Sequence, residues 1–151
     1  MKKIISILLV VSMLFSLSVT VFAAGTEENV LRFRKDGTFK ILVLADVQDV
    51  YPIDDAMISF VNEALDYAKP DLVVFDGDNI VTEDVRAYEQ LLYPLVSRNV
   101  PFTFVFGNHD PERENFTAEQ QLAEYQKYEG CLAYDADPAL HGCANHNLLI
   151  Y

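Results

Sequence analysis

Three short apolar runs, each ending directly in a polar cluster, constrain the fold of this chain more than any other feature. The runs cover residues 39–45, 72–75 and 102–106. They are rich in the β-branched and aromatic residues that favour strands, and they are continuous rather than alternating. Continuous apolar strands are typical of a parallel sheet whose two faces are both covered. The runs therefore predict three buried strands of one sheet.

Amphipathic segments separate the first two runs and then the second and third. Residues 54–68 carry apolar side chains at three- and four-residue steps between Pro52 and Pro70, as expected for one face of a helix. A second helix is expected after Thr82, which can cap its start, and Pro94 is expected to kink it. The alternation of strands and helices predicts an α/β fold with a mostly parallel sheet.

The last third of the chain predicts one more helix and one more strand. Thr117 and Gln120 form a capping box for a helix that runs to about Tyr128. The apolar run 148–151 is expected to begin a further strand. Residues 24–151 are enough for one hydrophobic core rather than two, so we expect a single domain there.

The first 23 residues have the organisation of a secretory signal peptide. Lys2 and Lys3 precede a serine-diluted apolar stretch, and Ala23 and Ala24 supply small residues for cleavage. A membrane anchor and an N-terminal core helix are the alternatives, but the stretch is marginal for a span and a core helix needs no basic start. We expect export of residues 24–151 to an extracellular or cell-envelope location, without a stable membrane anchor after cleavage.

The charge of the chain excludes one class of function and its cysteines leave a question open. Eleven basic residues stand against 23 acidic ones, and no basic block or stripe is present to neutralise phosphates, so nucleic-acid binding is not expected. The acidity favours solubility and agrees with carboxylates that hold cations. Cys131 and Cys143 are the only cysteines; an exported protein could join them in a disulfide or keep two thiols.

The polar clusters that end the three apolar runs are the main evidence on function. They are residues 46–49, 77–79 and 107–110, and parallel strands would deliver all three to the same edge of the sheet, where α/β proteins bind ligands. Each cluster alone could be an ordinary turn. Together they place carboxylates that repel one another unless a cation lies between them. An oxygen-rich set with one imidazole and no thiolate favours Mn²⁺, Fe³⁺ or Zn²⁺.

These clusters resemble the first three motifs of the calcineurin-like metallophosphoesterases, in the same order. The motifs are an Asp after the first strand, then Gly-Asp, then Gly-Asn-His-Asp at residues 107–110, which is the most specific of the three. Residues 71–80 and Gly142-Cys143-Ala144-Asn145 are similar to the purple-acid-phosphatase-like branch of that family. The resemblance covers residues 38–151 and implies an α/β/β/α sandwich, of which this chain holds the N-terminal half.

The resemblance also implies a site and a reaction. Asp46 would bind a first metal ion, Asp78 would bridge two ions, and Asn108 would bind the second ion and orient the phosphate. His109 would face the leaving-group oxygen, and Asp110 would orient His109 rather than bind metal. A metal-bound hydroxide would attack the phosphorus of a phosphate ester, with Mn, Fe or Zn as the candidate ions.

The chain departs from the family pattern at several positions. Gln48 stands where the family has a histidine, and Val81 stands where purple acid phosphatases have a tyrosine ligand. Gln48 through its amide oxygen, or else Asp49, could act as a replacement ligand. The later histidine motifs of the family are absent, and neither His141 nor His146 lies where the family places ligands. A further expectation is therefore that this is a fragment with little turnover by itself.

Two functions remain open at this stage. The first is an exported phosphoesterase, and the second is an exported domain of the same fold that has lost a full metal site. Asp at position 48 would be needed for a haloacid-dehalogenase-type phosphotransferase, but that residue is Gln48. The substrate, the choice between monoester and diester, and the oligomeric state are not indicated by the sequence.

Overall fold

The computed structural model describes residues 30–110, 112 and 115–151, and from Leu31 to Tyr151 the chain forms one compact unit. The predicted signal peptide, residues 1–23, lies outside the described residues. Within the described part of the chain, no helix is both long enough and apolar enough to cross a membrane.

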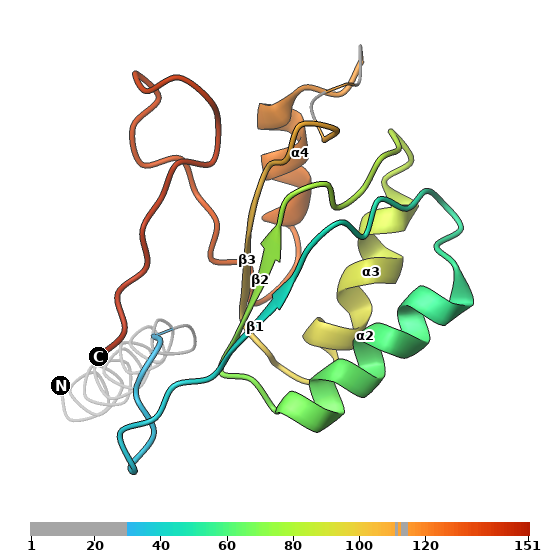
Figure 1. The fold of residues 1–151 in the computed structure, drawn as a ribbon. Helices are drawn as coiled ribbons and strands as arrows, with labels where there is room; N and C mark the ends of the chain where they lie inside the picture. Colours follow the sequence, from blue (N-terminus) through green and yellow to red (C-terminus); the bar gives the residue numbers. More distant parts are fainter. Residues whose placement is uncertain (1–29, 111, 113–114) are drawn as a thin grey trace, which may run out of the picture. The chain divides into compact units, whose positions relative to one another are not determined.

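A three-stranded parallel sheet forms the centre of this unit (Figure 1). Its strands are β1 (Ile41–Leu44), β2 (Leu72–Asp76) and β3 (Phe102–Val105), and they lie in the order β1-β2-β3. All three coincide with the predicted apolar runs, and both strand pairs are parallel. The prediction of an α/β fold is therefore confirmed.

Three helices are described: α2 (Asp55–Ala68), α3 (Arg86–Val96) and α4 (Ala118–Tyr125). Asp54 caps α2 by accepting the Ala56 N–H, and the capping box of α4 is present as predicted. The predicted cap by Thr82 is wrong. Helix α3 starts only at Arg86, because the Thr82 hydroxyl accepts the N–H of Asp84 in the preceding turn instead.

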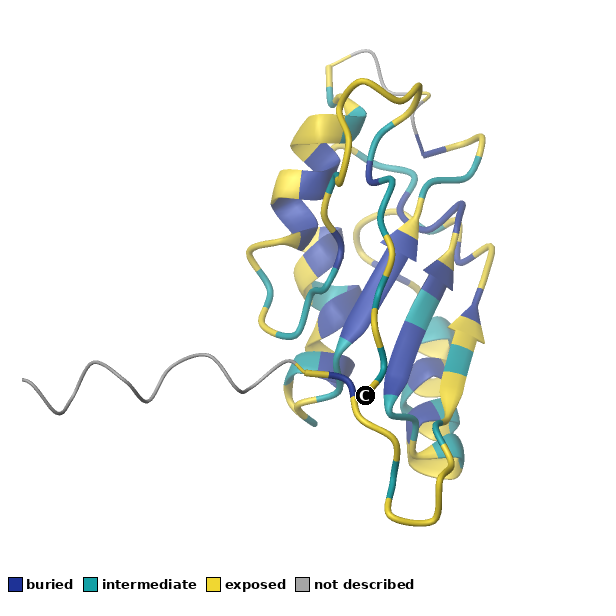
Figure 2. Cartoon of the chain, turned by 90° about the vertical axis from the view of Figure 1, so that its left-hand side faces the viewer, coloured by how far each residue is buried: buried dark blue, intermediate teal, exposed yellow. Residues whose placement is uncertain are grey.

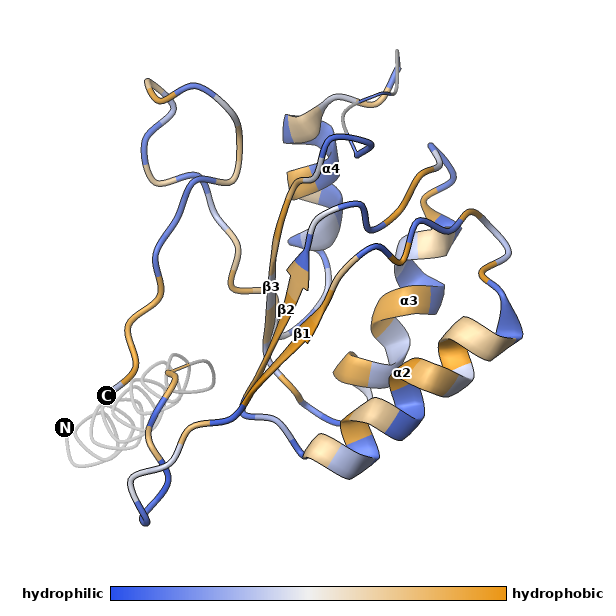
Figure 3. Cartoon of the chain, viewed as in Figure 1, coloured by the Kyte–Doolittle hydropathy of each residue, from blue (hydrophilic) through white to orange (hydrophobic). Residues whose placement is uncertain are grey.

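The helices pack on one face of the sheet, where alternate strand residues line up. The parallel register places Leu44, Phe75 and Phe104 side by side on this face, and all three are buried. Phe104 stacks on Tyr125 of α4 with ring centroids 3.9 Å apart, and Tyr125 in turn meets Tyr88 of α3 edge-on at 4.8 Å. Figure 3 shows the apolar strands in orange, with a hydrophilic segment directly after β2.

The opposite face of the sheet is covered unevenly (Figure 2). Ile41 and Val43 of β1 are 51% and 55% exposed, whereas Thr103 of β3 is buried beneath the closing segment of the chain. The prediction that both faces are covered is therefore wrong for β1. Thr103 Oγ1 lies 2.6 Å from His146 Nε2, and His146 Nδ1 lies 2.7 Å from the Ala144 carbonyl oxygen. His146 thus attaches the closing segment to the sheet.

The predicted strand at residues 148–151 is wrong. Among the described residues, only Tyr151 pairs there: its N–H donates to the Leu31 carbonyl, and its carbonyl accepts the Phe33 N–H at 2.7 Å. A strand needs a ladder of such bonds along its length, and one residue does not supply it. Cys131 and Cys143 are both free thiols in this structure.

Candidate metal site

The segments after β1 and β2 run side by side and are joined through their backbones. The Asp46 N–H donates to the Gly77 carbonyl at 3.1 Å, and the Gln48 N–H donates to the Asp78 carbonyl at 2.8 Å. A further parallel bridge pairs Asp49 with Ile80. The sheet register therefore continues past the strand ends and brings two of the predicted polar clusters together.

The segments after β2 and β3 approach each other closely because glycines face one another. A Cβ atom on Gly77 would lie 2.9 Å from Gly107 Cα, and a Cβ on Gly107 would lie 2.2 Å from Asp78 Oδ1. Neither distance is tolerable for a real side chain, so both positions require glycine for close backbone approach. The third predicted cluster is thereby packed against the second.

Asp78 lies at the centre of this arrangement and is only 8% exposed. Its Oδ1 accepts the backbone N–H of His109 at 2.8 Å, and its Oδ2 accepts Gln48 Nε2 at 3.3 Å. Both donors are neutral, and the segments 45–50, 76–80 and 106–110 contain no lysine or arginine. A buried carboxylate without a basic partner is costly unless a cation neutralises it.

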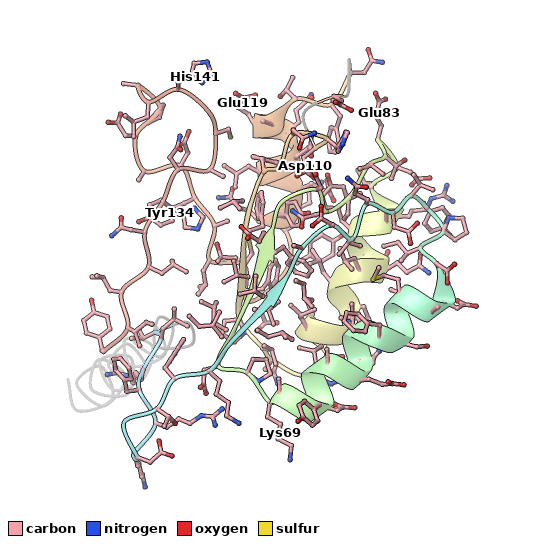
Figure 4. All side chains as sticks on the ribbon, viewed as in Figure 1. Lys69, Glu83, Asp110, Glu119, Tyr134 and His141 are labelled. Atoms are coloured by element: carbon pink, nitrogen blue, oxygen red, sulfur yellow. The ribbon has the colours of Figure 1, made fainter. Side chains whose placement is uncertain are left out.

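Asp110, labelled in Figure 4, is a second buried carboxylate, 2% exposed, and it makes a different set of contacts. It accepts three backbone N–H groups, from Asp78 at 2.8 Å, from Asn79 at 2.8 Å and from Gly107 at 2.7 Å. The prediction that Asp110 orients His109 is therefore wrong. The carboxylate that meets the imidazole is Glu112, whose Oε2 lies 3.0 Å from His109 Nδ1.

Glu112 and Gln121 contribute hydrogen bonds to this region, and neither was predicted from the sequence. A carboxylate only accepts hydrogen bonds, so the contact with Glu112 places the proton of His109 on Nδ1. The i, i+3 spacing of the two residues is a weak signal that could have indicated this pair. Gln121 of α4 donates to the Asp110 carbonyl at 2.7 Å, and no pattern in the sequence distinguishes it from an ordinary helix residue.

Two of the predicted ligands, Asp46 and Asn108, are exposed, and within the described residues no hydrogen bond of either side chain is found. Asp46 follows β1, and Asn108 lies in the turn between Gly107 and His109. The structure thus joins Gln48, Asp78 and His109 by direct hydrogen bonds and places Asp46 and Asn108 on the same edge with unengaged oxygens.

The backbone at this edge is strained. Asp46, Gln48 and Asp78 have φ angles of 55°, 44° and 51°, in the left-handed region that favours glycine. Each such residue costs on the order of 1 kcal/mol or more, and such strain clusters at functional sites. Among the described residues, six non-glycine residues have a positive φ, and three of them lie at this edge.

The donor set fits a hard cation, although sparsely. Among the described residues, no group of three or more His, Cys, Asp or Glu side chains is placed to hold a metal ion. Asp46 and Asp78 are the two carboxylates of the expected set, and Gln48 and Asn108 add only amide groups. Next to Asp78, the fully buried Asn79 also has a side-chain oxygen without a hydrogen-bond partner. This oxygen-rich set suits Mg²⁺ or Mn²⁺ better than a metal ion that prefers thiolate ligands.

The remaining candidates for metal binding lie elsewhere. Both ring nitrogens of His146 are engaged by Thr103 and the Ala144 carbonyl. His141 and Cys143 line a separate cavity of about 560 Å³ next to the end of β3. Burial, assisted by the carboxylates of Glu119 and Asp135, raises the pKa of the Cys143 thiol. This disfavours the thiolate, which is the form of cysteine that binds metals. The two carboxylate oxygens of Asp49 accept the N–H groups of Val50 and Asp54, so Asp49 stabilises its own loop.

Comparison with known proteins identifies relatives of this chain. The family model for the calcineurin-like phosphoesterases matches residues 39–147. The chain is 32% identical to the Arabidopsis thaliana protein "Probable inactive purple acid phosphatase 29", over 85% of this chain and 39% of that protein. It is 29% identical to "Probable inactive purple acid phosphatase 14" of the same plant, over 99% of this chain and 43% of that protein.

A yeast protein is also similar. The chain is 36% identical to "Phosphatase DCR2" of Saccharomyces cerevisiae, over 51% of this chain and 17% of that protein. The chain thus spans about two-fifths of the length of the two plant relatives. No solved structure matches it.

Proposed function

The chain belongs to the calcineurin-like phosphoesterase family, and from that premise we propose that it supplies the metal-holding edge of an exported phosphate-ester hydrolase. The observation that carries this proposal is Asp78, a buried carboxylate at the junction of three strand ends, which accepts only neutral hydrogen-bond donors from the part of the chain that the structure describes. A bound cation would compensate the charge of this carboxylate.

In this proposal Asp78 and Asp46 hold divalent ions, Asn108 contributes its amide, and Gln48 occupies the place of a missing imidazole. When bound, such ions supply an activated water and neutralise the charge that develops on a transferring phosphoryl group. The exposed Asn108 side chain would orient the phosphate. His109 would face the oxygen of the leaving group, and Glu112, whose Oε2 lies 3.0 Å from His109 Nδ1, would orient the ring.

The experiment compares two carboxylates at the end of the same strand. The protein is expressed from its complete reading frame, stripped of metal with a chelator, and assayed with a chromogenic phosphate monoester and a diester with and without Mn²⁺. We expect hydrolysis only with Mn²⁺, and we expect Asp78→Asn to lower it by more than the roughly 100-fold that loss of a mere supporting group costs. Asp76→Asn removes an exposed carboxylate two residues earlier and should leave the rate unchanged.

Either of two results would overturn the proposal: full hydrolysis by the chelator-treated protein, or undiminished hydrolysis by Asp78→Asn. A second function is favoured by the sparse donor set. Gln48 replaces an imidazole, and two of the relatives are named as inactive phosphatases. For a non-catalytic domain of the same fold, Mn²⁺ would neither bind the wild-type protein nor change its thermal stability.

Export is a separate part of the proposal. It rests on the pattern of residues 1–23, in which two lysines precede an apolar stretch and small residues. N-terminal sequencing of the protein recovered outside the cytoplasm should read from Ala24, and an intact Met1 on that protein would refute this part alone.

A further inference from the structure

The carboxylate of Asp110 is buried without an ion pair among the described residues, and its hydrogen bonds explain how it is accommodated. Oδ2 accepts the N–H groups of both Asp78 and Gly107, at 2.8 and 2.7 Å, and Oδ1 accepts the N–H of Asn79 at 2.8 Å. Three amide donors stabilise a carboxylate strongly, because hydrogen bonds to an ionised acceptor are shorter and stronger than neutral ones.

The three donors belong to two different strand ends. Asp78 and Asn79 follow β2, and Gly107 follows β3. One carboxylate therefore ties the loop that carries the central Asp78 to the turn that carries Asn108 and His109. The glycines at positions 77 and 107 let the two backbones come close enough for a single side chain to reach both.

Helix α4 holds the backbone of Asp110 in place. Gln121 donates its side-chain amide to the carbonyl oxygens of Asp110 at 2.7 Å and of Phe116 at 3.1 Å. The Gln121 side-chain oxygen in turn lies 3.4 Å from the Tyr88 hydroxyl of α3. Gln121 is only 2% exposed, so water does not compete for these contacts.

We propose that Asp110 is a positioning residue that acts through the backbone of Asp78 and Gly107 to set the separation between the metal-holding and phosphate-facing groups. This inference rests on the proposed function, because it assigns Asp110 a role in that site. An amide could not replace the carboxylate. It has one acceptor oxygen instead of two, and its NH₂ group would face the N–H of Asn79, which is fully buried.

The test measures Mn²⁺ affinity by electron paramagnetic resonance on the complete protein, and it measures hydrogen exchange of the Asp78, Asn79 and Gly107 amides. Asp110→Asn should weaken Mn²⁺ binding roughly 10- to 100-fold, as loss of a residue that supports a ligand does. The three amides should exchange roughly 10-fold faster or more, since they lose their acceptor. Wild-type affinity in a folded Asp110→Asn variant would overturn the inference.

Asp110→Glu separates position from charge. It keeps the negative charge but moves the oxygens by one methylene, so weaker Mn²⁺ binding in this variant assigns the effect to geometry. Wild-type affinity there would show that charge alone matters and would refute the positioning role. This variant also decides the question if Asp110→Asn does not fold.

Asp71→Asn is the matched control, because Asp71 accepts the Lys40 N–H at 2.7 Å at the other end of the same sheet. It should lower stability while leaving the Mn²⁺ affinity of the folded protein unchanged. Equal loss of affinity in the Asp71 and Asp110 variants would show a general structural effect and overturn the inference. If the wild-type protein does not bind Mn²⁺, the proposed function fails. The amide exchange then still tests whether the Asp110 carboxylate holds the Asp78, Asn79 and Gly107 amides.

Discussion

The two ends of the parallel sheet hold their buried or half-buried carboxylates in different ways. At the amino end, Asp71 accepts Arg34 Nε at 2.9 Å and the Lys40 N–H at 2.7 Å, so its charge is neutralised within the chain. At the carboxyl end, Asp78 and Asp110 accept only neutral donors among the described residues. Figure 4 labels Lys69 and Asp110 at these opposite ends.

Under the proposed function, this difference separates an end of the sheet that is stabilised by its own contacts from an end that would bind a ligand. The amino end is self-sufficient: Arg34 and Lys40 also donate to the carbonyl oxygens of Lys69 and Ala68 at the end of α2. At the carboxyl end, Asp78 and Asp110 have no basic partner among the described residues, and a bound cation would offset the cost of their buried charge. Substitutions at matched positions can test this contrast.

The largest expected contrast is between two glycines. A Cβ on Gly107 would lie 2.5 Å from the Asp78 backbone nitrogen, whereas a Cβ on Gly37 near the amino end meets nothing within 4 Å. We expect Gly107→Ala to lower the free energy of unfolding by roughly 3 kcal/mol. Gly37→Ala should cost about 1 kcal/mol, which is the penalty of its positive φ. Urea unfolding measures both, and equal losses would mean that the carboxyl end can relax.

The second expected contrast is in the sign of the change in stability, between Asp71→Asn and Asp78→Asn in metal-free protein. The first variant loses hydrogen bonds to Arg34 and Lys40 and should be destabilised by about 1–2 kcal/mol. The second removes an uncompensated buried charge and should unfold at the same or a higher denaturant concentration. Addition of Mn²⁺ should raise the melting temperature of Asp71→Asn but not of Asp78→Asn. Destabilisation of both variants by similar amounts would remove the distinction between the two ends.

The smallest expected effect concerns strained backbone. Lys69 has a φ of 46° at the C-terminal cap of α2, and its side chain is exposed. Lys69→Gly should therefore stabilise the protein by roughly 0.5–1 kcal/mol and leave Mn²⁺ affinity unchanged. Gln48→Gly relieves a similar angle at the other end but removes the contact with Asp78, so it should change Mn²⁺ affinity. Calorimetry with and without Mn²⁺ distinguishes the two, and identical behaviour would contradict a functional reason for the strain.

The sequence predicted the positions of the strands and helices better than it predicted the hydrogen bonds and neighbouring segments around them. All three strands and the three helices were expected close to where they lie, because periodicity, capping residues and prolines act over a few residues. The cap by Thr82 and the strand at residues 148–151 were wrong. In each case a competing hydrogen bond or the lack of a neighbouring strand decided the outcome, and neither is visible in a local pattern.

The sequence by itself determined that three polar clusters follow three buried strands. Strand propensity and burial depend on the types of residues in a short run, and these can be read directly from the sequence. Only the tertiary structure decided what each polar side chain does. Asp110 reaches Asp78 and Asn79 across 32 and 31 residues of sequence, and His109 meets Glu112 rather than Asp110. The partners of Asp110 depend on the register between strands and on glycines that allow close approach, and a linear pattern specifies neither. The contact between His109 and Glu112 is local, and only its i, i+3 spacing is visible in the sequence.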